Sequence, residues 1–95
     1  MSATSPRIGL RETIEGAFKP YVAHLAYFDD DLRLRITVTF RAHGPIIYDS
    51  GPLETDLFAE KGKAKELILE MRSQLPRAYP LEPWSFPENF EERAL

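Results

Sequence analysis

The chain has 95 residues, of which 12 are lysine or arginine and 15 are aspartate or glutamate, giving a net charge of −3. This length fits one domain with a single core, the lack of cysteine excludes disulfides and thiolate metal ligands, and the acidic balance argues against a dedicated nucleic-acid binder. No apolar run is long enough to span a bilayer and no secretion signal opens the chain, so we expect a cytoplasmic protein with no membrane partner and one domain over 1–95.

The N-terminal third predicts a helix followed by a strand. Residues 1–5 are expected to be frayed, and Pro6 suits the first turn of a helix. Apolar residues at helical spacing then predict a helix over 6–18: Leu10, Ile14, and Ala17 with Phe18. Side chains alternate in character over 21–28, which predicts a strand.

Residues 32–42 carry the strongest pattern in the sequence. The apolar positions are Leu32, Leu34, Ile36, Val38, Phe40 and Ala42, and they alternate with Arg33, Arg35, Thr37, Thr39 and Arg41. A strict period of two predicts a strand with one buried face and one solvent-exposed face. The aspartates before it predict a turn. A two-residue loop would place Leu25 opposite Leu34, and a shift of two residues keeps the apolar faces matched, whereas a shift of one does not.

A third, short strand is predicted over 46–49. His43-Gly44-Pro45 predicts the turn before it, and the run 49–52, Asp-Ser-Gly-Pro, predicts its end. The flanking prolines suit an edge strand. The sequence does not fix the register of this strand.

The main helix is predicted over 56–75, with Thr55 or Asp56 as its cap. Gly62 interrupts its first half, so the helix either bends there or begins near Glu60. The sequence leaves both readings open.

From residue 76 the chain becomes rich in proline and large apolar side chains. We expect 76–86 to lie extended, and 87–94 to form a short helix. Trp84 and Phe86 either close the small core of their own domain or bind a partner.

These elements together predict an α+β fold in the order α-β-β-β-α. The expected architecture is a three-stranded antiparallel meander with two helices on one face, a Pro-rich aromatic tail and a short C-terminal helix. A sheet this small leaves a strand edge open, which could pair with a second copy to form a homodimer.

The sequence contains no motif for catalysis or for a cofactor. There is no Gly-x-Ser-x-Gly elbow, no HExxH stretch and no glycine-rich phosphate loop. His24 and His43, without cysteine, do not define a zinc site, and the aspartates 29–31 lack the spacing of a calcium loop. We therefore expect neither an enzyme nor a bound cofactor or metal ion.

The most specific surface feature is a stripe of arginines on the predicted strand. Alternation places Arg33, Arg35 and Arg41 on one side, with His24 beside them on the neighbouring strand. The stripe is interpreted either as a solvent-exposed sheet face whose charges keep the protein soluble, or as a docking face for an acidic partner or nucleic acid. Alternation alone explains it, which favours the first interpretation.

A second basic cluster opens the main helix at Lys61, Lys63 and Lys65. The element order over 6–75, with this cluster at the start of its last helix, resembles the double-stranded-RNA-binding domain. The resemblance implies that these lysines contact phosphates. Gly62 stands where that family has one of its paired lysines.

We therefore expect a small non-catalytic interaction protein, such as a regulator, inhibitor or accessory subunit, that binds another protein. Its predicted contacts are His24 with the three arginines, or Trp84 with Phe86. The alternative is a double-stranded nucleic-acid binder that uses Lys61, Lys63 and Lys65.

Overall fold

The computed structural model of the protein describes residues 9–90 and shows a three-stranded antiparallel sheet in the order β1-β2-β3. The predicted α+β fold and its α-β-β-β-α order are confirmed. A short 3₁₀ helix, η1, precedes the second helix. The elements are α1 (Leu10–Ala17), β1 (Val22–Phe28), β2 (Arg33–Thr39), β3 (Ile46–Glu54), η1 (Thr55–Phe58) and α2 (Lys61–Ser73).

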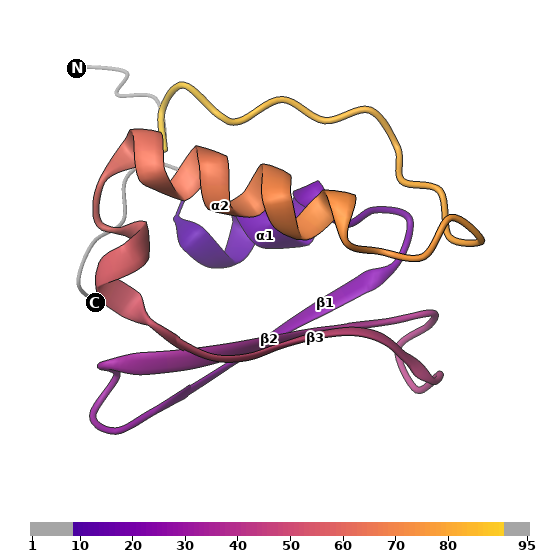
Figure 1. Cartoon of the computed structure of the whole chain (residues 1–95), viewed down its shortest axis with the longest axis horizontal. Coiled ribbons are helices and arrows are strands. Elements are labelled where there is room, and N and C mark those ends of the chain that lie inside the picture. Colours follow the sequence, from indigo (N-terminus) through magenta and orange to yellow (C-terminus); the bar gives the residue numbers. More distant parts are fainter. Residues whose placement is uncertain (1–8, 91–95) are drawn as a thin grey trace, which may run out of the picture.

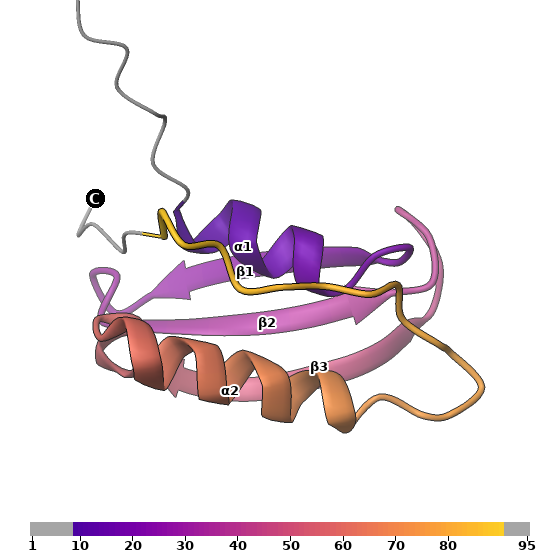
Figure 2. The same cartoon turned by 90° about the horizontal axis from the view of Figure 1, so that it is seen from above.

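Both helices cover the same face of the sheet, and the other face is open (Figure 1). The tail after α2 returns over the helices, on their side away from the sheet, and runs between α1 and α2 when seen from above (Figure 2). The described region thus has three layers: sheet, helices and tail. None of the helices within residues 9–90 has the length and apolar character needed to cross a membrane.

The core lies between the sheet and the helix layer. Leu34, Ile36 and Val38 of β2 are fully buried, because β2 is the central strand and its inner face lies beneath the helices. Apolar burial contributes about 25 cal/mol per Å², so packing rather than helix propensity stabilises helices this short. The helices contribute Leu10, Ile14 and Ala17 from α1 and Ala64, Ile68 and Met71 from α2.

The β1–β2 hairpin has the predicted faces but not the predicted register. Leu25 pairs with Ile36 rather than with Leu34, because the loop has four residues, 29–32, instead of two. Asp29, Asp30 and Asp31 all adopt positive φ angles, of 56°, 54° and 66°. Aspartate tolerates this left-handed region better than most residues do. The resulting shift of two residues leaves the apolar faces matched.

The strand predicted over 32–42 is shorter at both ends. Leu32 belongs to the turn and is 67% exposed, and Phe40 is 40% exposed. The Phe40 N–H donates to the Pro45 carbonyl (3.0 Å), so the chain turns as soon as β2 ends. Ala42 is exposed in this turn. The prediction that these three apolar residues share the buried face is therefore wrong.

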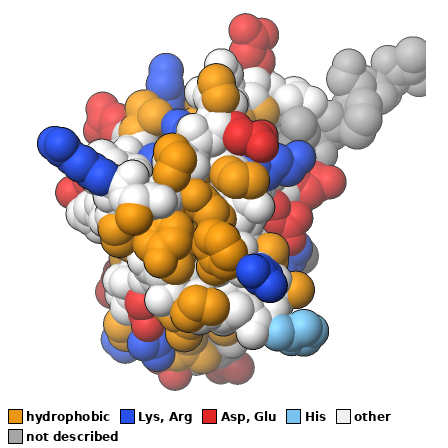
Figure 3. All heavy atoms as spheres, turned by 90° about the vertical axis from the view of Figure 1, so that its right-hand side faces the viewer, with side chains coloured by type: hydrophobic (Ala, Val, Ile, Leu, Met, Phe, Trp, Pro, Cys, Tyr) orange, Lys and Arg blue, Asp and Glu red, His pale blue; other side chains and the backbone are white. Residues whose placement is uncertain are grey.

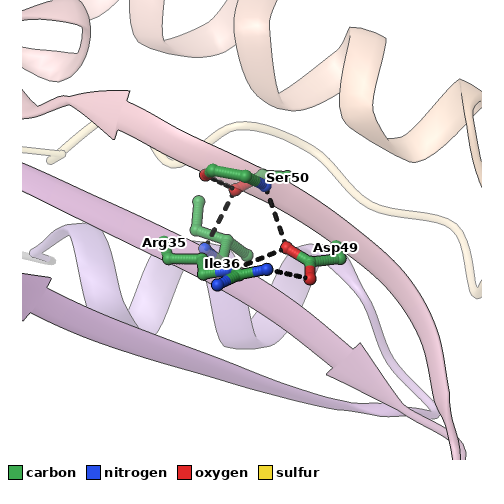
Figure 4. Close-up of polar contacts among 5 residues, drawn as sticks. Arg35, Ile36, Asp49 and Ser50 are labelled. Carbon is green, nitrogen blue, oxygen red and sulfur yellow. Dashed lines mark hydrogen bonds and ion pairs between the residues drawn. The ribbon is translucent and has the colours of Figure 1, made fainter.

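The third strand continues through the run predicted to end it. β3 extends beyond 46–49 because a register irregularity opposite β2 absorbs the turn-like residues. Gly51 has a φ of 72°, which glycine adopts without a steric cost. The Ser50 hydroxyl accepts a hydrogen bond from the Ile36 N–H at 3.0 Å (Figure 4). A side chain thus satisfies a backbone donor that the irregularity leaves without a strand partner.

The helix bounds also differ from the predicted ones. Residues 6–8 of the first predicted helix lie outside the described residues. The second helix begins at Lys61 with Glu60 as its N-cap, so it does not bend at Gly62. Thr55 and Asp56 belong to η1 and do not cap α2, so that prediction is wrong. The Thr55 hydroxyl instead donates to backbone carbonyls of the β1–β2 turn.

The tail is extended over 76–86 apart from a turn after its first residues. The Glu82 N–H donates to the Lys19 carbonyl at 2.9 Å, which fixes the tail beside the end of α1. The segment ends in a turn in which the Phe90 N–H donates to the Pro87 carbonyl (3.3 Å). The predicted helix over 87–94 is absent up to residue 90, and its remainder lies outside the described residues.

Candidate functional site

Two of the three arginines predicted to form a basic face are paired with carboxylates. Arg35 makes a bidentate pair with Asp49 of β3, in which Nε donates to Oδ1 (2.9 Å) and Nη2 donates to Oδ2 (2.6 Å) (Figure 4). Arg33 Nε lies 3.6 Å from Asp29 Oδ2, and Glu54 is the cross-strand neighbour of Arg33. The open face therefore carries charges of both signs rather than a basic stripe.

The pair with Arg35 changes the titration of Asp49. Hydrogen bonds from Arg35 and then from the Gly51 N–H lower the pKa of Asp49 to about 2. A carboxyl whose pKa is lower in the folded state stabilises the fold above its unfolded pKa, and this contribution is lost as the pH falls towards about 2. We expect Arg35→Ala to raise the pKa of Asp49, as measured by NMR titration of the carboxyl carbon. Arg33→Ala should leave it at about 2, and an equal shift in both variants would contradict the assignment.

Of the remaining members of the predicted basic face, Arg41 lies apart from these arginines and His24 lies on their face. Arg41 lies beyond the end of β2, and its guanidinium stacks over the Phe40 ring at 5.4 Å from the centroid. His24 is exposed on the open face, where its Nε2 lies 3.1 Å from the Thr39 hydroxyl. Three of the four predicted residues thus share the open face, and Arg41 alone lies outside it.

The lysines of the alternative site lie exposed at the start of α2. Lys61 donates a hydrogen bond through its ammonium group to the Glu88 carbonyl of the tail. Lys63 and Lys65 extend the cluster along the helix, and Glu60 lies directly before it. This part of the surface again mixes both signs of charge.

Trp84 and Phe86 pack on their own domain. Trp84 lies against Gly16 of α1, and the Arg72 guanidinium of α2 covers its indole at 5.4 Å. Phe86 contacts the Trp84 ring at 6.0 Å and the Phe90 ring at 4.9 Å between centroids, and Phe90 is buried in the core. Both rings are partly buried against the domain's own core, and contact with a partner stays a prediction.

Three aromatic rings from distant segments meet at one end of the molecule. Tyr21 precedes β1, Phe40 follows β2 and Tyr79 lies in the tail. Their centroids are 5.8 to 5.9 Å apart, in tilted or edge-to-face arrangements. We call these three residues the aromatic patch. All three rings remain partly accessible, and Ile46, close to Phe40 across the turn, is 61% exposed.

Cationic side chains accompany each ring of the aromatic patch. Lys19, Arg41 and Arg77 each lie within two residues of one ring, and none of them forms an ion pair within residues 9–90. Figure 3 views this end and shows a continuous apolar region with charged side chains of both signs around it. Exposed apolar surface with a polar rim is typical of protein-binding sites, at which tyrosine and arginine are enriched.

A groove of about 410 Å³ adjoins the aromatic patch. It lies between the last turn of α2 and the start of the tail. Tyr79 lines both the groove and the patch, so the two form one continuous surface. The other apolar lining residues include Leu75, Pro76, Pro80 and Leu81.

Sequence reasoning missed this site because its rings are far apart along the chain. A local signal does exist: each ring has a lysine or arginine within two positions, and both tyrosines adjoin a proline. No property of the sequence, however, indicates that these three segments meet at one end of the sheet.

Comparison with family models, with curated proteins and with solved structures gives no match. Within residues 9–90, no group of three or more histidine, aspartate or glutamate residues is placed to hold a metal ion.

Proposed function

We propose that this protein is a non-catalytic interaction protein that binds a partner protein through the aromatic patch and the adjoining groove. The partner segment has an apolar anchor with acidic residues beside it. The proposed contact surface lies at one end of the molecule, not on the open face of the sheet.

The observation that carries the proposal is the combination of accessible rings with free cations. Lys19, Arg41 and Arg77 have no carboxylate partner among the described residues, whereas Arg33 and Arg35 do. Acidic residues of a partner segment can therefore pair with these three cations, and such complementarity fixes orientation and accelerates association. Buried aromatic anchors supply most of the affinity in interfaces of this kind.

Site-specific photo-crosslinking in cells tests the proposal. A photoreactive phenylalanine analogue at position 40 should give a discrete adduct with another protein. The same analogue at position 57 should not, although Leu57 is equally exposed, at 42% against 40%. Arg41→Glu should reduce the adduct at position 40 at least several-fold, since it replaces attraction to acidic residues with repulsion.

Two outcomes would reject this site. Adducts of equal yield at positions 57 and 40 would show that exposure alone determines the reaction, and the absence of an adduct at position 40 would exclude the aromatic patch as the binding site.

The nucleic-acid alternative has one supporting observation, the exposure of Lys61, Lys63 and Lys65 at the start of α2 in a fold with both helices on one face. The mixed charges around these lysines weigh against it, because phosphate binding depends on a net positive surface. In the crosslinking experiment, adducts that contain nucleic acid and that disappear when all three lysines are replaced by alanine would favour this alternative.

A further inference from the structure

The end of the molecule opposite the aromatic patch presents a leucine on an acidic turn. Leu32, in the turn between β1 and β2, is 67% exposed, the highest value among the large hydrophobic residues that the structure describes. Asp29, Asp30 and Asp31 precede it and are also exposed. In Figure 1 this turn lies at the left, whereas the segments that form the aromatic patch meet at the right. We call residues 29–32 the acidic turn.

Hydrogen bonds fix the backbone of the acidic turn. The Leu32 N–H donates to the Asp29 carbonyl (2.9 Å), which closes the turn. From η1, the Thr55 N–H donates to the Leu32 carbonyl (3.0 Å), and the Thr55 hydroxyl lies 3.0 Å from the Asp31 carbonyl. The turn therefore presents Leu32 to solvent on a backbone that is already ordered, which lowers the entropy lost on binding.

We infer that the aromatic patch and its groove receive the acidic turn of a second copy of this chain, with Leu32 as the apolar anchor. This inference rests on the proposed function and names its partner. The proposed partner segment has an apolar anchor with acidic residues beside it, and the chain carries such a segment at its other end.

The charges at the two ends are complementary. Asp30 and Asp31 form no ion pair within residues 9–90, whereas Asp29 lies near Arg33. The three cations beside the aromatic patch likewise have no carboxylate partner in this part of the chain. The contact thus brings together free charges of opposite sign, which favours this orientation of the two copies over one that places two patches or two acidic turns face to face.

The contact joins different surfaces of the two copies. One chain cannot bring its own acidic turn to its own patch, because the two lie at opposite ends of the molecule (Figure 1). Each contact leaves one patch and one acidic turn free, so further copies add in the same way. A contact made by one four-residue turn is smaller than the roughly 1,200 Å² of stable interfaces, so the association is weak and depends on concentration.

Mixing two variants tests this head-to-tail contact. Arg41→Glu alters the patch and keeps the acidic turn, whereas Leu32→Ser removes the anchor and keeps the patch. We expect neither variant to associate alone, while their equimolar mixture forms a dimer and nothing larger. Sedimentation equilibrium at high concentration should therefore give about twice the 10.9 kDa mass for the mixture, and a mass that continues to rise with concentration for the unchanged chain.

The matched control is Leu57→Ser, which alters another exposed leucine, 42% exposed, in η1 and outside the acidic turn. It should associate as the unchanged chain does. Three results would overturn the inference: a monomeric mass for the unchanged chain at every concentration, association of either Arg41→Glu or Leu32→Ser alone at the level of the unchanged chain, or an equal loss in Leu57→Ser and Leu32→Ser.

Photo-crosslinking of the purified protein separates this inference from the proposed function. The photoreactive analogue at position 40 should give an adduct of two chains, with the new bond in the peptide that contains residues 29–32. An adduct with a different protein in cells, without an adduct of two chains in the purified protein, would overturn the inference and leave the proposed function standing. The absence of any adduct in both experiments would overturn both.

Discussion

Replacing Phe58 with alanine is expected to lower the free energy of unfolding by about 3–5 kcal/mol, because truncating a buried aromatic ring removes apolar contacts and leaves a cavity. Phe58 is fully buried, and it lies in the 3₁₀ helix that joins β3 to α2. Small domains have a total stability of only about 5–15 kcal/mol, so this loss is a large fraction of the whole. Urea denaturation followed by circular dichroism measures it.

The neighbouring residue provides a matched control. Leu57 lies in the same 3₁₀ helix but is 42% exposed. Leu57→Ala should therefore have a much smaller effect than Phe58→Ala, although both variants shorten an apolar side chain in the same turn. Similar losses in the two variants would mean that backbone propensity, rather than burial of the ring, accounts for the effect.

The alternation in the second strand was sufficient to predict the layers of this fold. Leu34, Ile36 and Val38 point into the core, and Arg33 and Arg35 lie on the open face. A side-chain period of two determines the face of each residue without any knowledge of the partner strand.

Register and strand length depend on local backbone conformations that the pattern does not encode. Asp29, Asp30 and Asp31 all adopt left-handed conformations, which lengthens the hairpin loop to four residues. Ser50 and Gly51 belong to a run typical of a turn, yet a hydroxyl that accepts a backbone hydrogen bond keeps this run within β3. In both places a few residues determine the hairpin register or the strand length, and they do so against the usual tendency of their residue types.

The candidate site was beyond sequence reasoning for a different reason. The arginine stripe follows from local alternation, but its charge is balanced by Asp49, 14 residues later, through a contact that only the β2–β3 register creates. The aromatic patch requires Tyr21, Phe40 and Tyr79 to meet, and the position of the tail decides this. Both features are properties of contacts between segments rather than of any one segment.

The position of the tail depends in turn on Arg72. Its Nε donates to the Ala17 carbonyl at the end of α1 (2.9 Å), and Nη2 donates to the Glu82 carbonyl of the tail (2.6 Å). The same guanidinium covers the Trp84 ring. One side chain of α2 therefore connects both helices with the tail that lies over them.

We expect Arg72→Ala to lower the free energy of unfolding by about 2–3 kcal/mol. Hydrogen bonds from a charged donor contribute about 1.5–3 kcal/mol, and the Arg72 side chain is partly exposed. Arg72→Lys should recover only part of the loss, since an ammonium group lacks the planar fork that reaches two carbonyls. The control is Arg77→Ala, which removes an exposed arginine without a hydrogen-bond partner among the described residues.

Trp84 is the only tryptophan, so its fluorescence reports the tail directly. In Arg72→Ala its emission should move to longer wavelength under conditions in which circular dichroism still shows folded helices and sheet, because the indole loses its cover while the core between sheet and helices persists. Unchanged emission, or a stability equal to that of Arg77→Ala, would mean that packing of Trp84 and Phe90 alone holds the tail. In that case the tail would keep Tyr79 in the aromatic patch without help from Arg72.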